Sequence, residues 1–327
     1  MSAAATRSGW RPARISPSTG CGCIRLEGGT TVRLWLTGAA GFVGRHLARR
    51  LVEDGHEIIG TDLSADPFGG WTRLDLRDRP AVIAALAEAR PDLVVHAGAI
   101  SGPMLARGEP ALMFDVNVTG TLSVLEAMRR AAVPRLVHFS SNAVYRDRED
   151  RLPVGEDWAI GKTDPYGASK VAAEAIVASY AASAGIDAWM LRIASIYGPG
   201  RTSPYLVSDL IAAGRTGGSV VVTDERSNMR QFVAVEDVVE AVAAAVGTPA
   251  GGCVPVNITG GEYLSEAAIG AMVQTHLPAL RLDVVADKGE NGDGAIGPLD
   301  LARARDRLGY RPAIPIAVGI ARLVGGA

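Results

Sequence analysis

The stretch Thr37-Gly38-Ala39-Ala40-Gly41-Phe42-Val43-Gly44 follows a short apolar run at 32–36 and precedes a helical pattern at 42–54. Its glycines recur at intervals of three, unlike the G-x-G-x-x-G spacing of many dinucleotide sites. Gly38 permits a tight turn, Gly41 lets the backbone approach a pyrophosphate, and Gly44 lets the helix pack on the strand. The helix N-terminus offers N–H groups and a positive dipole to phosphates. The stretch therefore predicts a phosphate-binding loop, with an ordinary turn as the alternative.

Outward from this loop, short apolar runs alternate with helical patterns, which is typical of a parallel sheet covered on both faces. Strands are predicted at 32–36, 57–61, 93–96, 136–139 and 188–193, and helices at 42–54, 81–89, 111–131 and 166–182. After residue 200 the rhythm loosens, with helices predicted at 205–213, 235–246 and 264–274 and short strands near Val220 and Val254. We expect a doubly wound α/β domain at 32–196 and a smaller α/β domain at 197–327 that can return a strand or two to the first.

The composition excludes several classes of protein. The chain has 327 residues, a formal net charge of −2 and three cysteines. The near-zero charge gives no basic surface for nucleic acid, and the histidines show no metal-ligand spacing, so neither partner is expected. The apolar runs are too short to cross a bilayer, and residues 1–31 lack the apolar segment of a signal peptide. We expect no membrane partner, a cytoplasmic location, and a leader at 1–31 that is disordered or stems from a misassigned start codon.

Asp62 ends the second predicted strand, 24 positions after Gly38. A carboxylate at this place can accept hydrogen bonds from both ribose hydroxyls of a dinucleotide, and it repels a 2′-phosphate. The residues that follow, Leu63-Ser64-Ala65, contain no Arg or Lys to bind that phosphate. Asp62 therefore favours NAD over NADP as the cofactor, although an Asp at a strand end can also cap a turn.

Tyr166 and Lys170 lie four positions apart at the start of a predicted helix, so their side chains share one face. An ammonium group close to a phenol stabilises the phenolate, which lowers the tyrosine pKa from its usual value of about 10. Such a phenol can take a proton from a substrate alcohol as hydride leaves its carbon. Ser141 follows the strand at 136–139 and reaches the same sheet edge, where its hydroxyl can hold the substrate oxygen. A Tyr and a Lys at this spacing also occur on solvated helix faces, so the hypothesis depends on the whole ordered set.

In this order, the motifs resemble those of the extended short-chain dehydrogenase/reductase superfamily, the NAD-dependent epimerase/dehydratase family, over about residues 32–320. The glycine stretch resembles the family's T-G-x-x-G-x-x-G loop, and Tyr166-Gly167-Ala168-Ser169-Lys170 resembles its catalytic Tyr/Lys motif. The resemblance implies a Rossmann fold with a smaller C-terminal substrate-binding domain and NAD as the cofactor. It also implies that Ser141, Tyr166 and Lys170 are the catalytic residues.

The same resemblance implies which residues bind the cofactor and the substrate. Asp75 and Leu76 match the pair that contacts the adenine, and Asn117 matches a structural Asn of the active-site helix. The implied cofactor-binding residues are Gly38, Ala40, Gly41, Phe42, Val43, Gly44, Asp62, Asp75, Leu76, Ala97, Gly98, Ala99, Asn117, Ser140, Tyr166, Lys170, Ile193 and Ile196. The implied substrate-binding residues are Ser101, Ser141, Asn142, Ser195 and Arg230.

Departures from the family pattern bear on the reaction and the substrate. Where the dehydratases carry an acidic pair after the catalytic Ser or Thr, this chain has Asn142 followed by an alanine, which disfavours a dehydratase. Ser195 stands where many nucleotide-sugar enzymes have an Asn that holds the diphosphate, which disfavours a nucleotide sugar. Arg230 favours one, because its family counterpart often contacts a diphosphate. The alternative for Arg230 is a surface ion pair with Glu236 or Asp237.

We therefore expect an NAD-dependent oxidoreductase that transfers a hydride at a hydroxyl-bearing carbon of a sugar or sugar derivative. A sugar dehydrogenase releases its oxidised product and NADH, whereas in an epimerase the same NADH returns the hydride to the other face. A nucleotide-sugar 4-epimerase is one alternative. A non-catalytic NAD(P)-binding redox sensor is another, although such sensors typically lose the Tyr or the Lys that this chain retains. By analogy with the family, a homodimer is expected through the helices at 111–131 and 166–182.

Overall fold

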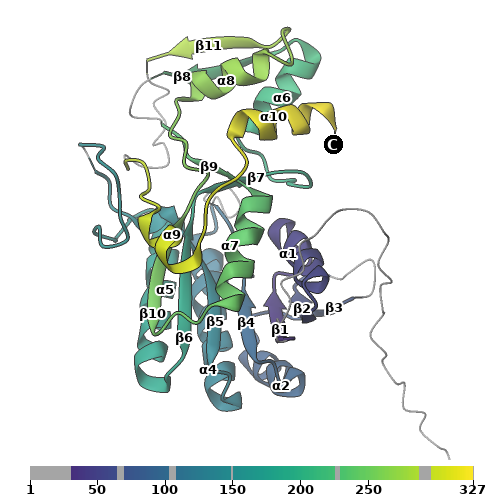
Figure 1. Cartoon of the computed structure of the whole chain (residues 1–327), viewed down its shortest axis with the longest axis vertical. Helices are drawn as coiled ribbons and strands as arrows, with labels where there is room; N and C mark the ends of the chain where they lie inside the picture. Colours follow the sequence, from purple (N-terminus) through teal and green to yellow (C-terminus); the bar gives the residue numbers. More distant parts are fainter. Residues whose placement is uncertain are drawn as a thin grey trace, which may run out of the picture.

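The parallel sheet that the apolar runs predict is present in the computed structural model, which describes residues 31–64, 70–102, 108–148, 150–224, 229–286 and 296–326. Apart from Thr31, the expected leader lies outside these residues. The sheet strands are β1 (Arg33–Thr37), β2 (Glu57–Asp62), β3 (Trp71–Arg73), β4 (Leu93–His96), β5 (Arg135–Ser141), β6 (Asp187–Ile193) and β10 (Cys253–Ile258). Within the described residues, these seven strands pair in parallel in the order β10-β6-β5-β4-β1-β2-β3 (Figure 1). The order reverses between β1 and β4, which is the doubly wound arrangement and the usual place for a ligand.

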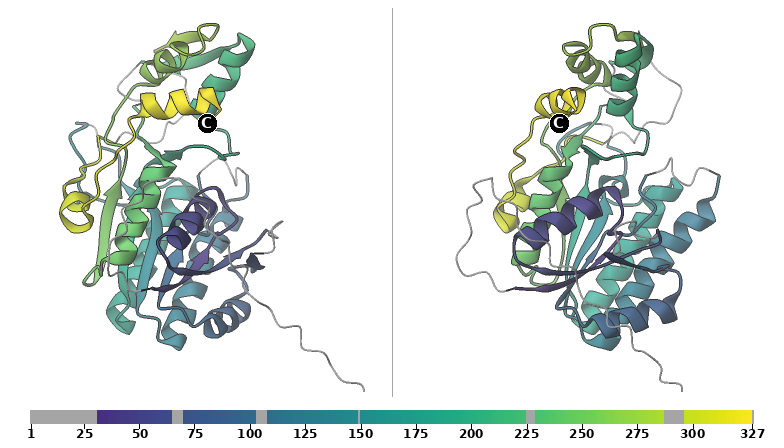
Figure 2. Two further views of the ribbon diagram at one scale, coloured as in Figure 1. Left: turned by 45° about the vertical axis from the view of Figure 1, so that its right-hand side comes forward. Right: turned by 90° about the vertical axis from the view of Figure 1, so that its right-hand side faces the viewer.

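Helices cover both faces of the sheet (Figure 2). The central strands have apolar residues on both sides because their alternate residues pack into two different cores. Leu34 and Leu36 of β1 join one core, whereas Trp35 between them joins the other. The first core is covered by α1 (Phe42–Glu53) and α7 (Val235–Gly247), with α9 (Ala302–Leu308). The second is covered by α2 (Arg79–Ala89), α4 (Gly120–Ala131) and α5 (Pro165–Ala184).

The single helix expected at 111–131 is wrong in one respect. The chain forms α3 (Pro110–Phe114), then a π-helical turn η1 (Asp115–Thr119), and then α4. The apolar periodicity continues through this turn. A π-helix differs in its backbone hydrogen bonds, and the pattern of apolar residues does not reveal that difference. Such turns are frequent at functional sites, and this one contains Asn117.

The second half of the chain divides its elements between two places. A group that we call the C-terminal cluster comprises α6 (Leu206–Thr216), β8 (Ser219–Thr223), α8 (Glu266–Gln274), β11 (Arg281–Val285) and α10 (Ile316–Gly325). These elements share a third core and lie beyond one end of the sheet (Figure 1, top). Strand β10, by contrast, pairs with β6, so the expected return of a strand to the first layer is confirmed.

The link to the C-terminal cluster leaves from the carboxyl end of the sheet. Strand β6 ends at Ile193, and the chain continues at once into β7 (Ser195–Tyr197), which pairs with β9 (Phe232–Ala234). The cluster therefore lies at the edge where the parallel strands end and where the candidate residues gather. In the part of the chain that the structure describes, no helix has the length and apolar character needed to cross a membrane.

Candidate active site

The glycine loop between β1 and α1 is held by close backbone contacts. Gly38 has a φ of +73°, and a Cβ added to it would lie 2.8 Å from the amide nitrogen of Gly98. A Cβ on Gly44 would collide with the carbonyl oxygen of Gly38, because α1 packs directly on the loop. Gly41 is the N-cap of α1 and provides no side-chain hydrogen bond to the helix. The first N–H groups of α1, which include those of Phe42 and Val43, are therefore suited to phosphate oxygens, and the cradle fits a dinucleotide.

Asp62, the last residue of β2, reaches the same loop. Its Oδ2 accepts a hydrogen bond from the backbone amide of Ala40 at 3.1 Å, and its Oδ1 accepts one from the amide of Ser64 at 2.9 Å. The amide of Ala39 donates to the carbonyl oxygen of Thr61 at 3.1 Å. A carboxylate thus lies at the strand end beside the glycine loop, where a ribose of a dinucleotide would be bound.

The other side of the cradle is the end of β4, followed by Ala97, Gly98 and Ala99. The amide of Gly98 donates to the Thr37 hydroxyl at 3.0 Å. A Cβ on Gly98 would lie 2.9 Å from Cδ1 of Leu76, so a larger residue would displace Leu76. Asp75, next to Leu76, pairs with Arg77 at 2.6 Å, and that hydrogen bond lowers the pKa of Asp75.

His96 is buried behind this segment as a neutral imidazole. Its Nε2 lies 3.1 Å from the Thr121 hydroxyl, whose own proton is donated to the carbonyl oxygen of Asn117 at 2.6 Å. Thr121 must therefore accept from an Nε2–H, which leaves Nδ1 of His96 to accept from the Thr37 hydroxyl at 2.8 Å. Burial, with a smaller contribution from the charge of Lys170, lowers the pKa of His96 to about 3. These bonds indicate a structural role for His96.

The π-turn residue Asn117 joins three segments of the site. Its Oδ1 accepts from the amide of Ile100 at 2.8 Å, and its Nδ2 donates to the Ile100 carbonyl oxygen at 3.1 Å. The same Nδ2 donates to the Ser169 hydroxyl at 3.0 Å, and Ser169 donates to the carbonyl oxygen of Tyr166 at 2.7 Å. Asn117 thereby braces the first turn of α5 against the chain that leaves β4. Ser101, which follows Ile100, is exposed.

Helix α5 begins where the sequence indicates. Asp164 is its N-cap and accepts from the amide of Gly167 at 2.9 Å, and Pro165 occupies its first position. A Cβ on Gly167 would lie 2.6 Å from the carbonyl oxygen of Ala143, so the helix start touches the segment that follows β5. This contact brings the turn that carries Tyr166 beside the segment that carries Ser141.

Lys170 is 4% exposed, and its ammonium group donates to the carbonyl oxygen of Phe139 at 2.9 Å. Burial lowers the pKa of Lys170 to about 8, and the charge of Glu174 acts in the opposite direction. Ser141 ends β5 and accepts from the amide of Ala143 at 3.1 Å, as the N-cap of the 3-10 turn η2 (Asn142–Val144). Ser140, expected to contact the cofactor, directs its hydroxyl to Glu174 at 2.5 Å.

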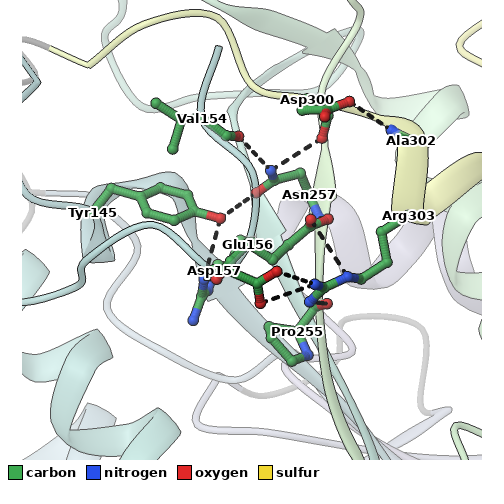
Figure 3. A network of polar contacts seen from close by, with 10 residues as sticks. Tyr145, Val154, Glu156, Asp157, Pro255, Asn257, Asp300, Ala302 and Arg303 are labelled. Atoms are coloured by element: carbon green, nitrogen blue, oxygen red, sulfur yellow. Dashed lines mark hydrogen bonds and ion pairs between the residues drawn. The ribbon is translucent and has the colours of Figure 1, made fainter. Parts of the chain in front are cut away.

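Arg192 of β6 belongs to a buried polar network that was not predicted from the sequence, and Figure 3 shows the part of this network around Tyr145, Glu156 and Asn257. Arg192 of β6 donates to Glu174 from Nε at 2.9 Å and from Nη2 at 2.7 Å, and to the Tyr145 hydroxyl from Nη1 at 3.1 Å. Tyr145 donates to Oδ1 of Asn257 at 2.6 Å. The amide of Asn257 donates to Glu156 at 2.8 Å. One feature of the sequence could have indicated this network: Glu174 follows Lys170 by four residues and so shares its helix face.

The substrate-side residues lie near the link to the C-terminal cluster. Ser195 and Ile196 are in β7, which continues from Ile193 at the end of β6. Arg230 pairs with Glu266, the first residue of α8, at 2.7 Å from Nη2 and 3.1 Å from Nε. The suggested ion pair of Arg230 with Glu236 or Asp237 is therefore wrong. The partner is the buried carboxylate of Glu266, which lies much further along the chain at the N-terminus of α8.

The suggestion failed for Asp237 because the main chain after α9 already engages it. Its carboxylate is buried and accepts from the amide of Ala313 at 2.9 Å and the amide of Ile314 at 3.2 Å. Burial raises the pKa of Asp237. Asp237 therefore secures the approach to α10, and its oxygens are not directed at Arg230.

Comparisons with known proteins agree with this geometry. A family model described as the NAD dependent epimerase/dehydratase family matches residues 34–258. The chain is 32% identical to a UDP-glucose 4-epimerase of Mycolicibacterium smegmatis, over 90% of this chain and 97% of that protein.

Two solved structures are similar over nearly the whole chain. One is the UDP-glucose 4-epimerase of Thermus thermophilus in complex with NAD, with a TM-score of 0.80 at 28% identity over 90% of this chain and 98% of that one. The other is MoeE5 in complex with UDP-glucuronic acid and NAD, with a TM-score of 0.79 at 28% identity over 88% and 96% of the two chains. The likeness therefore includes the sheet and the elements beyond it.

Proposed function

The chain belongs to the NAD-dependent epimerase/dehydratase family, and we propose that it is an NAD-dependent epimerase of a nucleoside diphosphate sugar. One observation carries this proposal, namely the junction between α5 and the end of β5. There the Lys170 ammonium binds the Phe139 carbonyl, and the first turn of α5 touches the segment after Ser141. These contacts support a site at the carboxyl edge of the sheet in which the Ser141 hydroxyl, the Tyr166 phenol and the Lys170 ammonium act together with NAD.

Each of the three residues has a distinct part in the proposed reaction. When bound, NAD supplies the acceptor and the donor of the hydride. Tyr166 takes the proton from the substrate hydroxyl during oxidation and gives it back during reduction. Lys170 stabilises the phenolate of Tyr166. The pKa of Lys170 is about 8, so its ammonium form is in the majority at neutral pH. Ser141 donates a hydrogen bond to the substrate oxygen and keeps the reacting carbon in place.

The residues that would hold NAD follow from the cradle. The glycine loop and the first N–H groups of α1 would bind the pyrophosphate, and Asp62 would accept from the ribose hydroxyls. A 2′-phosphate beside the Asp62 carboxylate would be repelled, which supports NAD over NADP. Asp75 and Leu76, at the open side of the cradle, are the proposed adenine contacts.

Two observations favour a nucleoside diphosphate as the part of the substrate that carries the sugar. The relatives named above act on or bind UDP-sugars. Arg230 is a cation held by Glu266 at the root of the C-terminal cluster, from where it can meet a diphosphate. Ser195, where an Asn is common, favours a smaller sugar acid. A dehydrogenase of such a compound is therefore the second candidate.

A substrate screen distinguishes these candidates. The purified protein is incubated with UDP-glucose, UDP-galactose, UDP-glucuronate and the corresponding free sugars and sugar acids, with and without added NAD. We expect the two epimers of one UDP-sugar to interconvert without net formation of NADH. Steady NADH formation with a free sugar acid would instead establish the dehydrogenase. Failure of NAD to bind in calorimetry would refute both.

The family resemblance also supports a homodimer through the helical segments at 111–131 and 166–182, a cytoplasmic location, and a substrate-binding role for residues 197–327. Light scattering tests the dimer, because a monomeric mass at micromolar concentration contradicts it. A shortened protein that begins at residue 32 tests whether residues 1–31 contribute to the activity. We expect it to retain the full activity.

A further inference from the structure

Glu174 lies one helical turn after Lys170 and is 3% exposed. Its Oε1 accepts from the Ser140 hydroxyl at 2.5 Å and from Nε of Arg192 at 2.9 Å, and its Oε2 accepts from Nη2 of Arg192 at 2.7 Å. The reaction proposed above gives Glu174 no part. A buried carboxylate at this place is costly unless its oxygens are fully paired, and here they are bound from two strands.

We propose that Glu174 is a positioning residue for the active site: its carboxylate, bound by Ser140 and Arg192, orients the serine pair at the end of β5 and places a negative charge one helical turn from Lys170. This inference deepens the proposed function and rests on it for the role of Lys170. The carboxylate acts on two catalytic residues from one place, through Ser140 on the strand and through space along α5.

The first action concerns Ser141. Successive side chains of a strand point to opposite faces, so the bond that holds Ser140 toward α5 also determines the direction of Ser141. Arg192 keeps Glu174 in place with two parallel hydrogen bonds, a geometry with high directional specificity. Arg192 is itself held by the Tyr145 hydroxyl and by the carbonyl oxygen of Glu156 at 2.8 Å. The serine position is therefore supported through Arg192 by Tyr145, which Figure 3 shows beside Asn257.

The second action concerns the charge on Lys170. Three titratable side chains act on or near its ammonium group: Glu174 from its own helix, His96 from β4 and His138 from β5. Both histidines are buried with lowered pKa values, so neither is charged at neutral pH. Arg192 of β6 is a further charged group at this place, because it binds both oxygens of Glu174. Among the described residues, Glu174 is thus the carboxylate that offsets the burial of Lys170, whose positive charge in turn favours the phenolate of Tyr166.

The lysine content of the chain makes a direct test feasible. The sequence contains only Lys162, Lys170 and Lys288. Selective ¹³C labelling of the lysine ε-carbons therefore gives a simple NMR spectrum, in which a Lys170→Met variant assigns the signal of interest. The signal is followed from neutral to alkaline pH, and in the wild-type protein we expect a midpoint near 8.

The decisive variant is Glu174→Gln, which keeps the shape of the side chain and removes its charge. We expect the Lys170 midpoint to fall by about one pH unit. The matched control is Glu156→Gln, which removes a buried carboxylate of the same network that binds Asn257, and we expect it to leave the midpoint unchanged. An unchanged midpoint in Glu174→Gln, or an equal fall in both variants, overturns the inference.

Kinetics test the positioning itself. In Glu174→Gln the alkaline limb of the kcat profile should move to lower pH together with the NMR midpoint. If circular dichroism shows that this variant does not fold, Ser140→Ala replaces it, because it cuts only the 2.5 Å bond. We expect kcat to fall about tenfold with KM for the sugar unchanged. An unchanged kcat overturns the inference.

The two proposals fail in different ways. A wild-type protein that converts no tested sugar, while the Lys170 midpoint still moves in Glu174→Gln, contradicts the proposed function and supports the effect of Glu174 on Lys170. If the wild-type protein is active and the Lys170 midpoint in Glu174→Gln equals that of the wild-type protein, only the role of Glu174 is contradicted.

Discussion

The ammonium group of Lys170 lies 2.9 Å from the carbonyl oxygen of Phe139, and this bond joins helix α5 to the end of strand β5. Phe139 stands two residues before Ser141, so the lysine that we propose to assist the phenol also binds the strand that carries the serine. A shift of α5 along its axis would break this bond and separate the proposed catalytic groups.

Tyr166→Phe should abolish most of the turnover while NAD still binds. The variant loses only the hydroxyl to which we assign the exchange of the substrate proton, and removal of a general base typically costs about 10²–10⁴-fold in rate. Calorimetry with NAD and an epimerisation assay measure the two effects. Tyr180→Phe, further along the same helix, is the matched control and should keep the wild-type rate. A Tyr166→Phe protein with normal turnover would show that another group moves the proton.

Gly44→Ala should prevent NAD binding and lower the thermal midpoint. The added methyl group would collide with the carbonyl oxygen of Gly38, and overpacking of this kind costs about 1–3 kcal/mol. Gly247→Ala, at the end of α7, has no atom within 4 Å of the new Cβ, so it should be neutral or stabilising by up to about 1 kcal/mol. Differential scanning calorimetry compares them, and equal midpoints would contradict the close packing of α1 on the loop.

Asp62→Asn should weaken NAD binding by about tenfold or more and reduce the preference of the protein for NAD over NADP. The amide keeps the shape of the side chain but loses the charge that strengthens hydrogen bonds from ribose hydroxyls and repels a 2′-phosphate. Dissociation constants for both cofactors are measured by calorimetry. Asp78→Asn, at the N-cap of α2, is the control and should change neither constant. An unaltered ratio of the two constants would remove Asp62 from the cofactor site.

The free energy of unfolding should fall as the pH is lowered from about 6.5 toward 3. Burial depresses the pKa of His96 to about 3 in the native state, whereas the unfolded chain binds the proton near 6.5. Between these values the unfolded state holds more protons, so acid favours it by about 1.4 kcal/mol per pH unit once the difference is fully developed. His138, whose pKa is also lowered by burial, adds in the same direction.

Urea titrations at several pH values measure this slope. His96→Gln should flatten it, whereas His276→Gln, an exposed position, should retain it. A slope that is the same in His96→Gln as in the wild-type protein would mean that His96 is not the group that is protonated on unfolding.

The fold was largely predictable because its strands are apolar runs bounded by turns, and each expected sheet strand appears within a residue or two of its place. The helix break at η1 was not, since a π-turn inserts a residue without disturbing the apolar pattern. The glycine loop, Asp62 and the Tyr/Lys pair were recognisable from local spacing. The pairings of Arg230 with Glu266 and of Glu174 with Arg192 join elements that only the folded sheet brings together.

Strand β10 has a consequence for how the protein is made. It supplies the outer neighbour of β6, yet it is synthesised only after α6, β8, β9 and α7 have left the ribosome. Until then the nascent chain exposes a row of unpaired backbone groups along β6, a known template for association with other chains. Nascent or truncated products that stop before residue 253 should therefore depend on chaperones. An added reporter domain is best joined after residue 258, because β10 can then pair with the exposed edge of β6.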